Sequence, residues 1–304
     1  MKISQLRCLL AVAEAGTVRQ AARDLNLSQS SVTKSIQLLE GSLQVELFLR
    51  GTHGLTPTAA GRMLVARAKA IMAELRQARN DVETIREGTS GEIRVSASPT
   101  VAVGILPRAV VSFRRTRPNV KFHIEEGGYP DFLPAIRMGE LDFAVALAPE
   151  PPSDEDLQSE LLIQDNLTPA VRGDHPLTMR GKLVLADLVD ESWVIYNRRL
   201  TGRDVFARTF TEHGLSPPEN TIECTSFSAT VALVENSNLV TMVPTQLFAD
   251  RRRRMAITPL FMGSPMPSWD VMVFSRRHHE LSPLCLAFLQ ELRRTADKSR
   301  VTAS

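Results

Sequence analysis

Apolar residues recur at helical spacing through the first forty positions, in three short stripes that predict three helices. The first stripe stops at Gly16, and Thr17 and Ser28 are placed to cap the second and third helices. The third helix has an apolar inner face with i, i+4, i+7 spacing, formed by Val32, Ile36 and Leu39. The pattern therefore predicts a small all-α head at the N-terminus.

The opposite face of the third helix carries uncharged hydrogen-bonding side chains and one lysine, with no acidic residue before Glu40. A solvated helix face usually mixes Glu and Lys, and an ordinary polar face remains the alternative. Gln and Lys can reach base edges, and Ser and Thr can bind phosphates or bases. We therefore predict DNA contacts from Ser28, Gln29, Ser30, Ser31, Thr33, Lys34 and Gln37.

A heptad pattern follows, with apolar residues at alternating steps of four and three. Thr56-Pro57 is a favourable helix start, and Gly88–Gly91 predicts a hinge after the helix. A period of 3.5 favours a two-helix coil between two copies, and a single amphipathic helix lying on its own core is the alternative. A dimer would present two recognition helices to an interrupted inverted repeat in double-stranded DNA. The expected seam is Leu64, Ala68, Ile71, Leu75, Ala78, Val82 and Ile85.

Beyond residue 92, short apolar runs alternate with helical segments in the βαβ rhythm of a doubly wound parallel sheet. A second set begins near Leu167, and a final strand and helix return to the first set. We therefore expect two α/β lobes with a cleft between them. The predicted domains are the head (1–58), the dimerising linker helix (59–87), the hinge (88–91) and an effector-binding domain (92–304), with lobe I at about 92–163 and 267–304 and lobe II at about 164–266.

Ligands of open α/β sheets bind beyond the carboxyl ends of the strands, at helix N-termini. Hydroxyl groups at these positions, with an arginine nearby, suit a small carboxylate or another anion. The alternative is that Ser and Thr only cap the helices there. The expected effector contacts are Ser98, Pro99, Thr100, Gly128, Tyr129, Asn197, Arg198, Thr225 and Ser226.

The distribution of charge along the chain supports the prediction that the head binds DNA. Residues 1–91 hold 12 Lys or Arg against 8 Asp or Glu, whereas the rest of the chain holds 24 against 26. The basic excess thus lies where a phosphate-binding surface needs it. No apolar run approaches the roughly 18 residues of a membrane span. The start of the chain lacks signal-peptide features, so we expect a cytoplasmic protein.

The sequence offers no nucleophile motif, paired carboxylates, metal-ligand spacing or specific phosphate loop. We therefore expect a protein that is not an enzyme and that holds no metal or cofactor. The alternatives to a specific regulator are a non-specific architectural DNA-binding protein and an enzyme built on a binding-protein fold.

Motifs at fixed spacing resemble the winged helix-turn-helix of bacterial LysR-type transcriptional regulators. They cover Gly16–Glu40, the stretch Leu47–Arg50, and the stretch Leu55–Gly61. The resemblance implies a winged helix-turn-helix with a long linker helix, followed by a two-lobed, periplasmic-binding-protein-like effector domain. It further implies that Arg50 and the wing residues Thr52 and His53 contact phosphates or the minor groove.

The resemblance also implies binding partners, and two positions of this chain depart from the family pattern. The partners are double-stranded DNA, a small-molecule effector, a second copy of the chain (as homodimer or homotetramer), and RNA polymerase. Gln44 stands where the family usually has Gly, which puts the local turn in doubt. Ser30 stands where the family commonly has Pro, and we expect the helix to form regardless.

Overall fold

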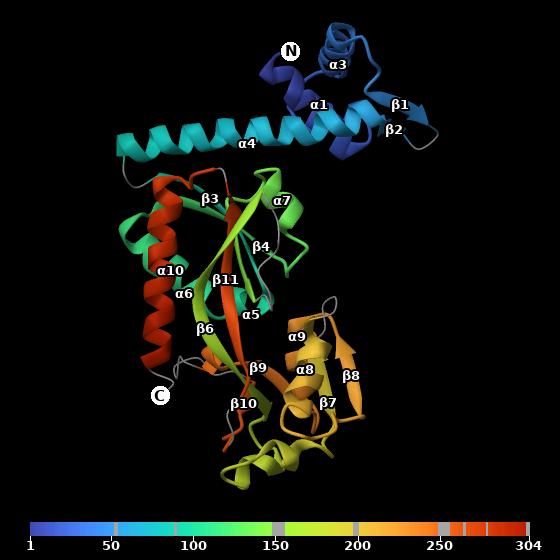
Figure 1. Ribbon diagram of the computed structural model, residues 1–304. Helices are drawn as coiled ribbons and strands as arrows, with labels where there is room; N and C mark the ends of the chain where they lie inside the picture. The colour runs from blue at the N-terminus through green and yellow to red at the C-terminus, as the bar shows by residue number, and fades with distance from the viewer. Residues whose placement is uncertain are drawn as a thin grey trace.

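The computed structural model describes residues 1–51, 54–87, 90–147, 156–196, 201–248, 256–263, 266–277 and 279–301. Three short helices and the first part of a long fourth one build the N-terminal head (Figure 1). The predicted caps form: Thr17 Oγ1 accepts from the Gln20 N–H at 3.2 Å, and Ser28 Oγ accepts from the Ser31 N–H at 3.1 Å. The helices are α1 (Ile3–Ala15), α2 (Val18–Asp24), α3 (Gln29–Leu43) and α4 (Ala59–Glu87).

A two-stranded wing, β1 (Phe48–Gly51) and β2 (Gly54–Pro57), follows α3. The Leu55 N–H donates to the Gly16 carbonyl at 2.7 Å, which fixes the wing against the turn between α1 and α2. Gly54 has φ +118°, and a side chain there would lie 2.5 Å from the Gly16 carbonyl oxygen. This position therefore requires glycine.

The linker helix α4 begins after Thr58, so the prediction of a start at Thr56-Pro57 was wrong. Pro57 pairs with Phe48 in the wing instead. Thr58 Oγ1 accepts from the Gly61 N–H at 2.9 Å and donates to the Glu46 carbonyl at 2.8 Å. One hydroxyl thus caps the helix and joins it to the segment before the wing.

Lobe I contains a mixed sheet. Strand β3 pairs in parallel with β4 and β5, whereas β11 pairs antiparallel with both β5 and β6. Only the β4–β3–β5 part follows the parallel pattern that the sequence rhythm predicts. The elements are β3 (Ser90–Ala97), α5 (Pro99–Val103), α6 (Ile105–Thr116), β4 (Asn119–Glu126), α7 (Leu133–Arg137), β5 (Phe143–Leu147), β6 (Leu157–Arg172), β11 (Ser268–Arg276) and α10 (Pro283–Val301).

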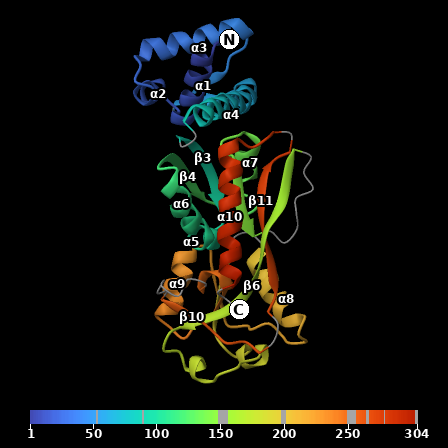
Figure 2. The ribbon, with the colours of Figure 1, turned by 90° about the vertical axis from the view of Figure 1, so that its left-hand side faces the viewer.

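Strand β6 runs from lobe I into lobe II (Figure 2), so it passes through Leu167, near which the sequence predicted the start of the second set of elements. Its first part pairs with β11, and its last part pairs with β9 and β10. The β7–β8 pair of lobe II is parallel. The lobe II elements are β7 (Trp193–Tyr196), α8 (Thr201–Thr211), β8 (Thr221–Cys224), α9 (Phe227–Glu235), β9 (Thr241–Pro244), β10 (Ile257–Pro259) and the 3-10 turns η1 (Pro176–Met179), η2 (Leu185–Leu188) and η3 (Thr245–Phe248).

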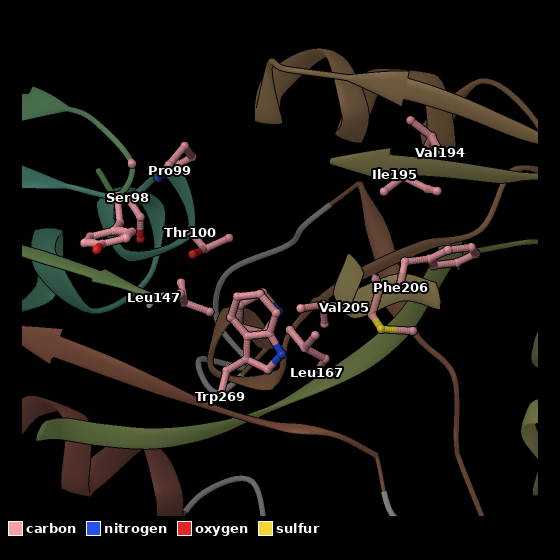
Figure 3. A pocket seen from close by; sticks show the side chains of 14 residues that line it. Ser98, Pro99, Thr100, Leu147, Leu167, Val194, Ile195, Val205, Phe206 and Trp269 are labelled. Atoms are coloured by element: carbon pink, nitrogen blue, oxygen red, sulfur yellow. The ribbon is translucent and has the colours of Figure 1, made fainter. Parts of the chain in front are cut away.

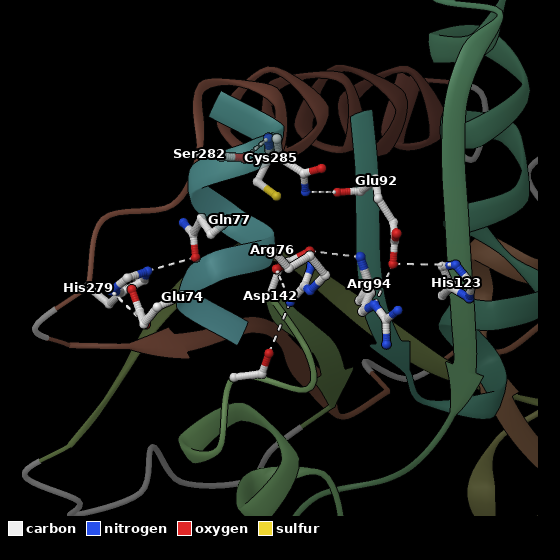
Figure 4. Close-up of polar contacts among 12 residues, drawn as sticks. Glu74, Arg76, Gln77, Glu92, Arg94, His123, Asp142, His279, Ser282 and Cys285 are labelled. Atoms are coloured by element: carbon white, nitrogen blue, oxygen red, sulfur yellow. Dashed lines mark hydrogen bonds and ion pairs between the residues drawn. The ribbon is translucent and has the colours of Figure 1, made fainter. Parts of the chain in front are cut away.

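The linker helix packs on lobe I through a polar contact (Figure 4). Arg76 Nη2 lies 3.0 Å from Asp142 Oδ1 and also donates to the Gly139 carbonyl at 3.0 Å. Asp142 Oδ2 accepts from the Arg94 N–H at 2.8 Å. The Arg76 and Asp142 side chains are 17% and 6% exposed, so this ion pair is largely shielded from water. It joins the linker helix, and through it the N-terminal head, directly to the sheet of lobe I.

A second set of contacts continues this interface toward β11. Arg276 Nη1 lies 2.7 Å from Glu74 Oε1, and His279 Nε2 lies 2.6 Å from Gln77 Oε1. Ser90 and Gly91, which the sequence placed in the hinge at 88–91, belong to β3 instead and pair with Asn119 and Val120. Gly88 and Thr89 lie outside the described residues.

Candidate DNA-reading surface and effector cleft

Helix α3 lies at the outer end of the molecule, on the side of the head away from lobes I and II (Figure 2). Its inner residues Val32, Ile36 and Leu39 are buried in the head core. Thr33 is half-buried. The exposed side chains on the helix include Gln29, Ser30, Ser31, Lys34 and Gln37. The periodicity of the core residues therefore presents a polar face that the described parts of the chain leave open to solvent.

The Ser28 hydroxyl bonds to two further serine hydroxyls at the start of α3. Ser28 Oγ lies 2.9 Å from Ser30 Oγ and 2.8 Å from Ser31 Oγ, while it caps the helix. Ser30 in place of proline does not prevent the helix, and Gln44 ends it in the left-handed conformation with φ +53°. Ser30 and Gln44, the two departures from the family pattern, therefore both permit the helix α3 and the turn after it.

Arg50 is exposed on β1, and Thr52 and His53 lie outside the described residues. The head also exposes Arg19 and Arg23 on α2, which sequence reasoning did not select. Their i, i+4 spacing on the polar side of the second stripe was the available signal. These side chains add positive charge to the head. Glu40, by contrast, turns back and accepts the Leu47 N–H at 2.8 Å.

The linker seam divides into two parts. Ala68 is fully buried and Leu64 is partly buried in the core of the head, because the N-terminal half of α4 covers α1. Farther along, Ile71, Ala78 and Val82 are exposed, and Leu75 is half-buried. The side chain of Ile85 is outside the described part of the chain. The described apolar surface left for a second copy is therefore shorter than the seven-residue seam that the sequence predicted.

A cavity of about 120 Å³ lies between the two lobes (Figure 3). It brings together five of the residues expected to contact an effector: Ser98, Pro99, Thr100, Gly128 and Tyr129. Asn197 and Arg198 lie outside the described residues. Thr225 and Ser226 are exposed and do not line this cavity. Ser226 caps α9 instead, accepting from the Ala229 N–H at 3.3 Å, which is the alternative left open for such residues.

The rest of the cavity wall is apolar, and its residues are not among the effector contacts expected from the sequence. These residues lie at strand ends, on α8 and on the strands that cross between the lobes. The only sequence feature that could have identified them is an apolar residue at a position where a polar contact is expected. They are Leu147, Leu167, Val194, Ile195, Val205, Phe206, Met242, Pro244 and Trp269.

Two hydroxyl groups inside this apolar wall lack hydrogen-bond partners among the described residues. Ser98 and Thr100 are 6% and 8% exposed, and neither Ser98 Oγ nor Thr100 Oγ1 is bonded. Buried hydroxyl groups are normally satisfied by protein or by another partner. The pair therefore marks the part of the cavity where a polar ligand group would be stabilised.

A winged helix-turn-helix carrying a polar recognition helix, joined to a two-lobed domain with an interlobe cavity, defines a DNA-binding regulator with a sensor domain. Comparison with known proteins gives the family. Residues 3–62 match the bacterial regulatory helix-turn-helix protein, lysR family, and residues 86–297 match the LysR substrate binding domain. The chain belongs to the LysR family and is a LysR-type transcriptional regulator, not an enzyme.

Individual relatives agree with this assignment. The transcriptional dual regulator GltC of Bacillus subtilis is 26% identical over 283 residues, covering 93% of this chain and 93% of GltC. The regulator GbpR of Azospirillum brasilense is 26% identical over 243 residues, covering 80% of this chain and 71% of GbpR. The structure of full-length CbnR with its target DNA has a TM-score of 0.74 at 22% identity, covering 97% of this chain and 100% of that one. This last similarity supports the fold.

Within the described parts of the chain, no helix combines the length and apolar character needed to cross a membrane.

Proposed function

We propose that this regulator binds double-stranded DNA as a dimer or tetramer, and that a small-molecule effector in the interlobe cavity changes how it binds. The observation that carries the proposal is the exposed face of α3, where Gln29, Lys34 and Gln37 lie at the outer end of the molecule and no acidic residue of the helix precedes Glu40. Such side chains can bond base edges and phosphates in the major groove. The effector would be a small carboxylate or another anion, and RNA polymerase is a further expected partner.

The relative CbnR was crystallised with its target DNA, which supports a DNA-bound state of the same architecture. Ile71 and Val82 leave apolar surface on α4, 39% and 64% exposed, and this surface supports pairing with a second copy. Two paired heads would read an interrupted inverted repeat. Arg50 and the wing residues Thr52 and His53 would contact the backbone or the adjacent minor groove.

Selection of bound sites from a random DNA library tests the DNA-binding part. A specific regulator enriches two half-sites in inverted repeat, whereas an architectural protein enriches no motif. Ile71→Glu and Val82→Glu should lower self-association and enrichment together, measured by analytical ultracentrifugation and by the same selection. Met179→Glu is a matched control, because Met179 is an exposed apolar residue in lobe II.

A thermal-shift screen of small carboxylates against the full chain tests the effector part, because a ligand stabilises the folded protein by mass action. Each hit is then added to a footprinting reaction on a selected site. If no stabilising compound alters the footprint, the effector part of the proposal fails and the DNA-binding part stands.

A further inference from the structure

The wall of the interlobe cavity combines an apolar majority with one polar corner. None of its 14 described lining residues carries a charge. In Figure 3, Ser98, Pro99 and Thr100 lie on one side of the cavity, and Val194, Ile195 and Phe206 lie on the opposite side. The two sides come from different lobes, so a ligand that joins them meets hydroxyl groups at one end and hydrocarbon at the other.

The polar corner is limited to one end of the cavity. Ser98 Oγ and Thr100 Oγ1 are the unpartnered buried side-chain atoms among the described lining residues. Both residues are more than nine-tenths buried. An acceptor or donor group of a ligand placed there would satisfy two buried hydroxyls at once, which is favourable because leaving them unpaired is costly.

The opposite wall disfavours a second polar group. Val194 and Ile195 from β7 and Phe206 from α8 are all buried. A charged or hydrogen-bonding group held against them would lose water without gaining a partner. The cavity volume of about 120 Å³ is similar to the roughly 150 Å³ of an apolar cavity that admits benzene. The space on this side suits a compact hydrocarbon body.

We propose that the effector is a single-headed compound: one carboxylate, carbonyl or hydroxyl group held by Ser98 and Thr100, on an apolar body about the size of one six-membered ring. This inference rests on the proposed function, since it assumes that the effector occupies this cavity. It excludes dicarboxylates and polyols, which carry polar groups at both ends.

Isothermal titration of the full chain with three matched probes tests the ligand class. Benzoate carries the head and the ring, acetate carries the head alone, and terephthalate adds a second carboxylate at the far end of the ring. Benzoate should bind at least about 30-fold more tightly than acetate, because each buried carbon adds to affinity. Terephthalate should bind at least about tenfold more weakly than benzoate, because its second carboxylate meets the apolar wall.

Substitutions in the polar corner test the orientation of the ligand. Thr100→Val keeps the shape and removes the hydroxyl, so benzoate should bind about five- to tenfold more weakly. Thr211→Val makes the same exchange at an exposed position of α8 outside the cavity, and it should leave benzoate affinity unchanged. Circular dichroism of both variants without ligand establishes that each is folded.

Trp269 offers an independent readout. The chain has two tryptophans, and Trp193 is fully buried with its indole N–H bonded to the Leu188 carbonyl at 3.1 Å. Trp269 lines the cavity, so benzoate should change its fluorescence. Trp269→Phe should greatly reduce this change while calorimetry still detects binding; Trp193, which packs against the cavity residue Phe206, can contribute only a remainder. A change of the same size in Trp269→Phe would place the ligand away from Trp269 and overturn the inference.

The outcomes separate this inference from the proposed function. Equal affinity for acetate and benzoate, tight binding of terephthalate, or no saturable benzoate binding at millimolar concentration each overturns the single-headed class. If benzoate binds as expected and the operator footprint does not change, the inference stands and the effector part of the proposed function fails. If a dicarboxylate binds more tightly and changes the footprint, the proposed function stands and the inference fails.

Discussion

The reading surface and the effector cavity differ in how many parts of the chain build them. The reading surface comes from consecutive turns of α3, and most of its side chains are exposed. The cavity draws on both lobes and on the strands that cross between them. Exposed residues of the reading surface can change without disturbing a core, whereas cavity residues that would contact an effector also hold a lobe together. The comparison therefore predicts two outcomes. Substitutions on the reading surface should change DNA binding without changing stability, whereas substitutions in the cavity should change effector binding and stability together.

The largest expected effect is the loss of a cavity aromatic. Phe206 packs against Trp193 and Phe210, with ring centroids 5.0 and 5.2 Å away. Phe206→Ala should lower the free energy of unfolding by about 3–5 kcal/mol and weaken effector binding as well. Lys34→Ala should change it by less than about 0.5 kcal/mol. Urea denaturation measures both, and equal losses would contradict the comparison.

The contact between the linker helix and lobe I should come next. Asp142→Ala leaves Arg76 buried without its carboxylate, and we expect a loss of about 3 kcal/mol in urea denaturation. Glu140→Ala removes the Lys69–Glu140 pair, whose side chains are 37% and 40% exposed, and should cost less than about 1 kcal/mol. If the two variants lose the same amount, the buried pair does not hold the halves of the chain together.

The reading surface should show its effect in DNA binding alone. Gln29→Ala should cost about 1–3 kcal/mol for the preferred base at one position of the site and relax discrimination there. Lys34→Ala, if Lys34 contacts phosphate, should weaken binding to all sequences and reduce the salt slope by about one. Competition binding on single-base variants of a selected site distinguishes these results. Uniform weakening by Gln29→Ala would indicate an architectural binder.

The smallest expected effect concerns His279 at the linker interface. Burial, with the nearby Arg276 cation, lowers the pKa of His279 below its ordinary 6.5, and Glu74, Asp81 and Asp142 oppose the shift in part. The unfolded chain therefore binds a proton at higher pH than the folded chain does. Stability should be fully present above pH 6.5 and should decline as the pH falls from 6.5 toward the lowered pKa.

Thermal unfolding from pH 7.5 to pH 5 measures this decline, and His279→Gln should make it shallower. Since His123 also lies near an acidic residue, His123→Gln serves as the control histidine, and it is more exposed. If the decline in stability is the same in His279→Gln, groups other than His279 cause it.

Much of the head could be predicted from the sequence because its determinants are local. Thr17 and Ser28 cap helices through residues three positions away, and the core side of α3 follows from its own period. The start of α4 was missed because Pro57 belongs to a strand pair that closes only in three dimensions. The predicted dimer seam was too long because part of it packs within one chain: Ala68 is buried in the core of the head.

The cavity was predicted in part. Ser98 and Thr100 follow directly from the rule that ligands sit beyond strand ends. Trp269 and Leu167 could not be found in this way, because they line the cavity only through the pairing and twist of β6 and β11. Their apolar character alone does not distinguish a cavity wall from an ordinary core position.

The buried apolar residues form separate clusters in the head, in lobe I and in lobe II. The described hydrogen bonds and ion pairs from α4 to the sensor reach lobe I elements and the turn after β11. Lobe II makes none of these contacts with α4. On the proposed function, its half of the cavity could therefore change over evolutionary time to suit a different effector, while the DNA sequence recognised by the head stays the same.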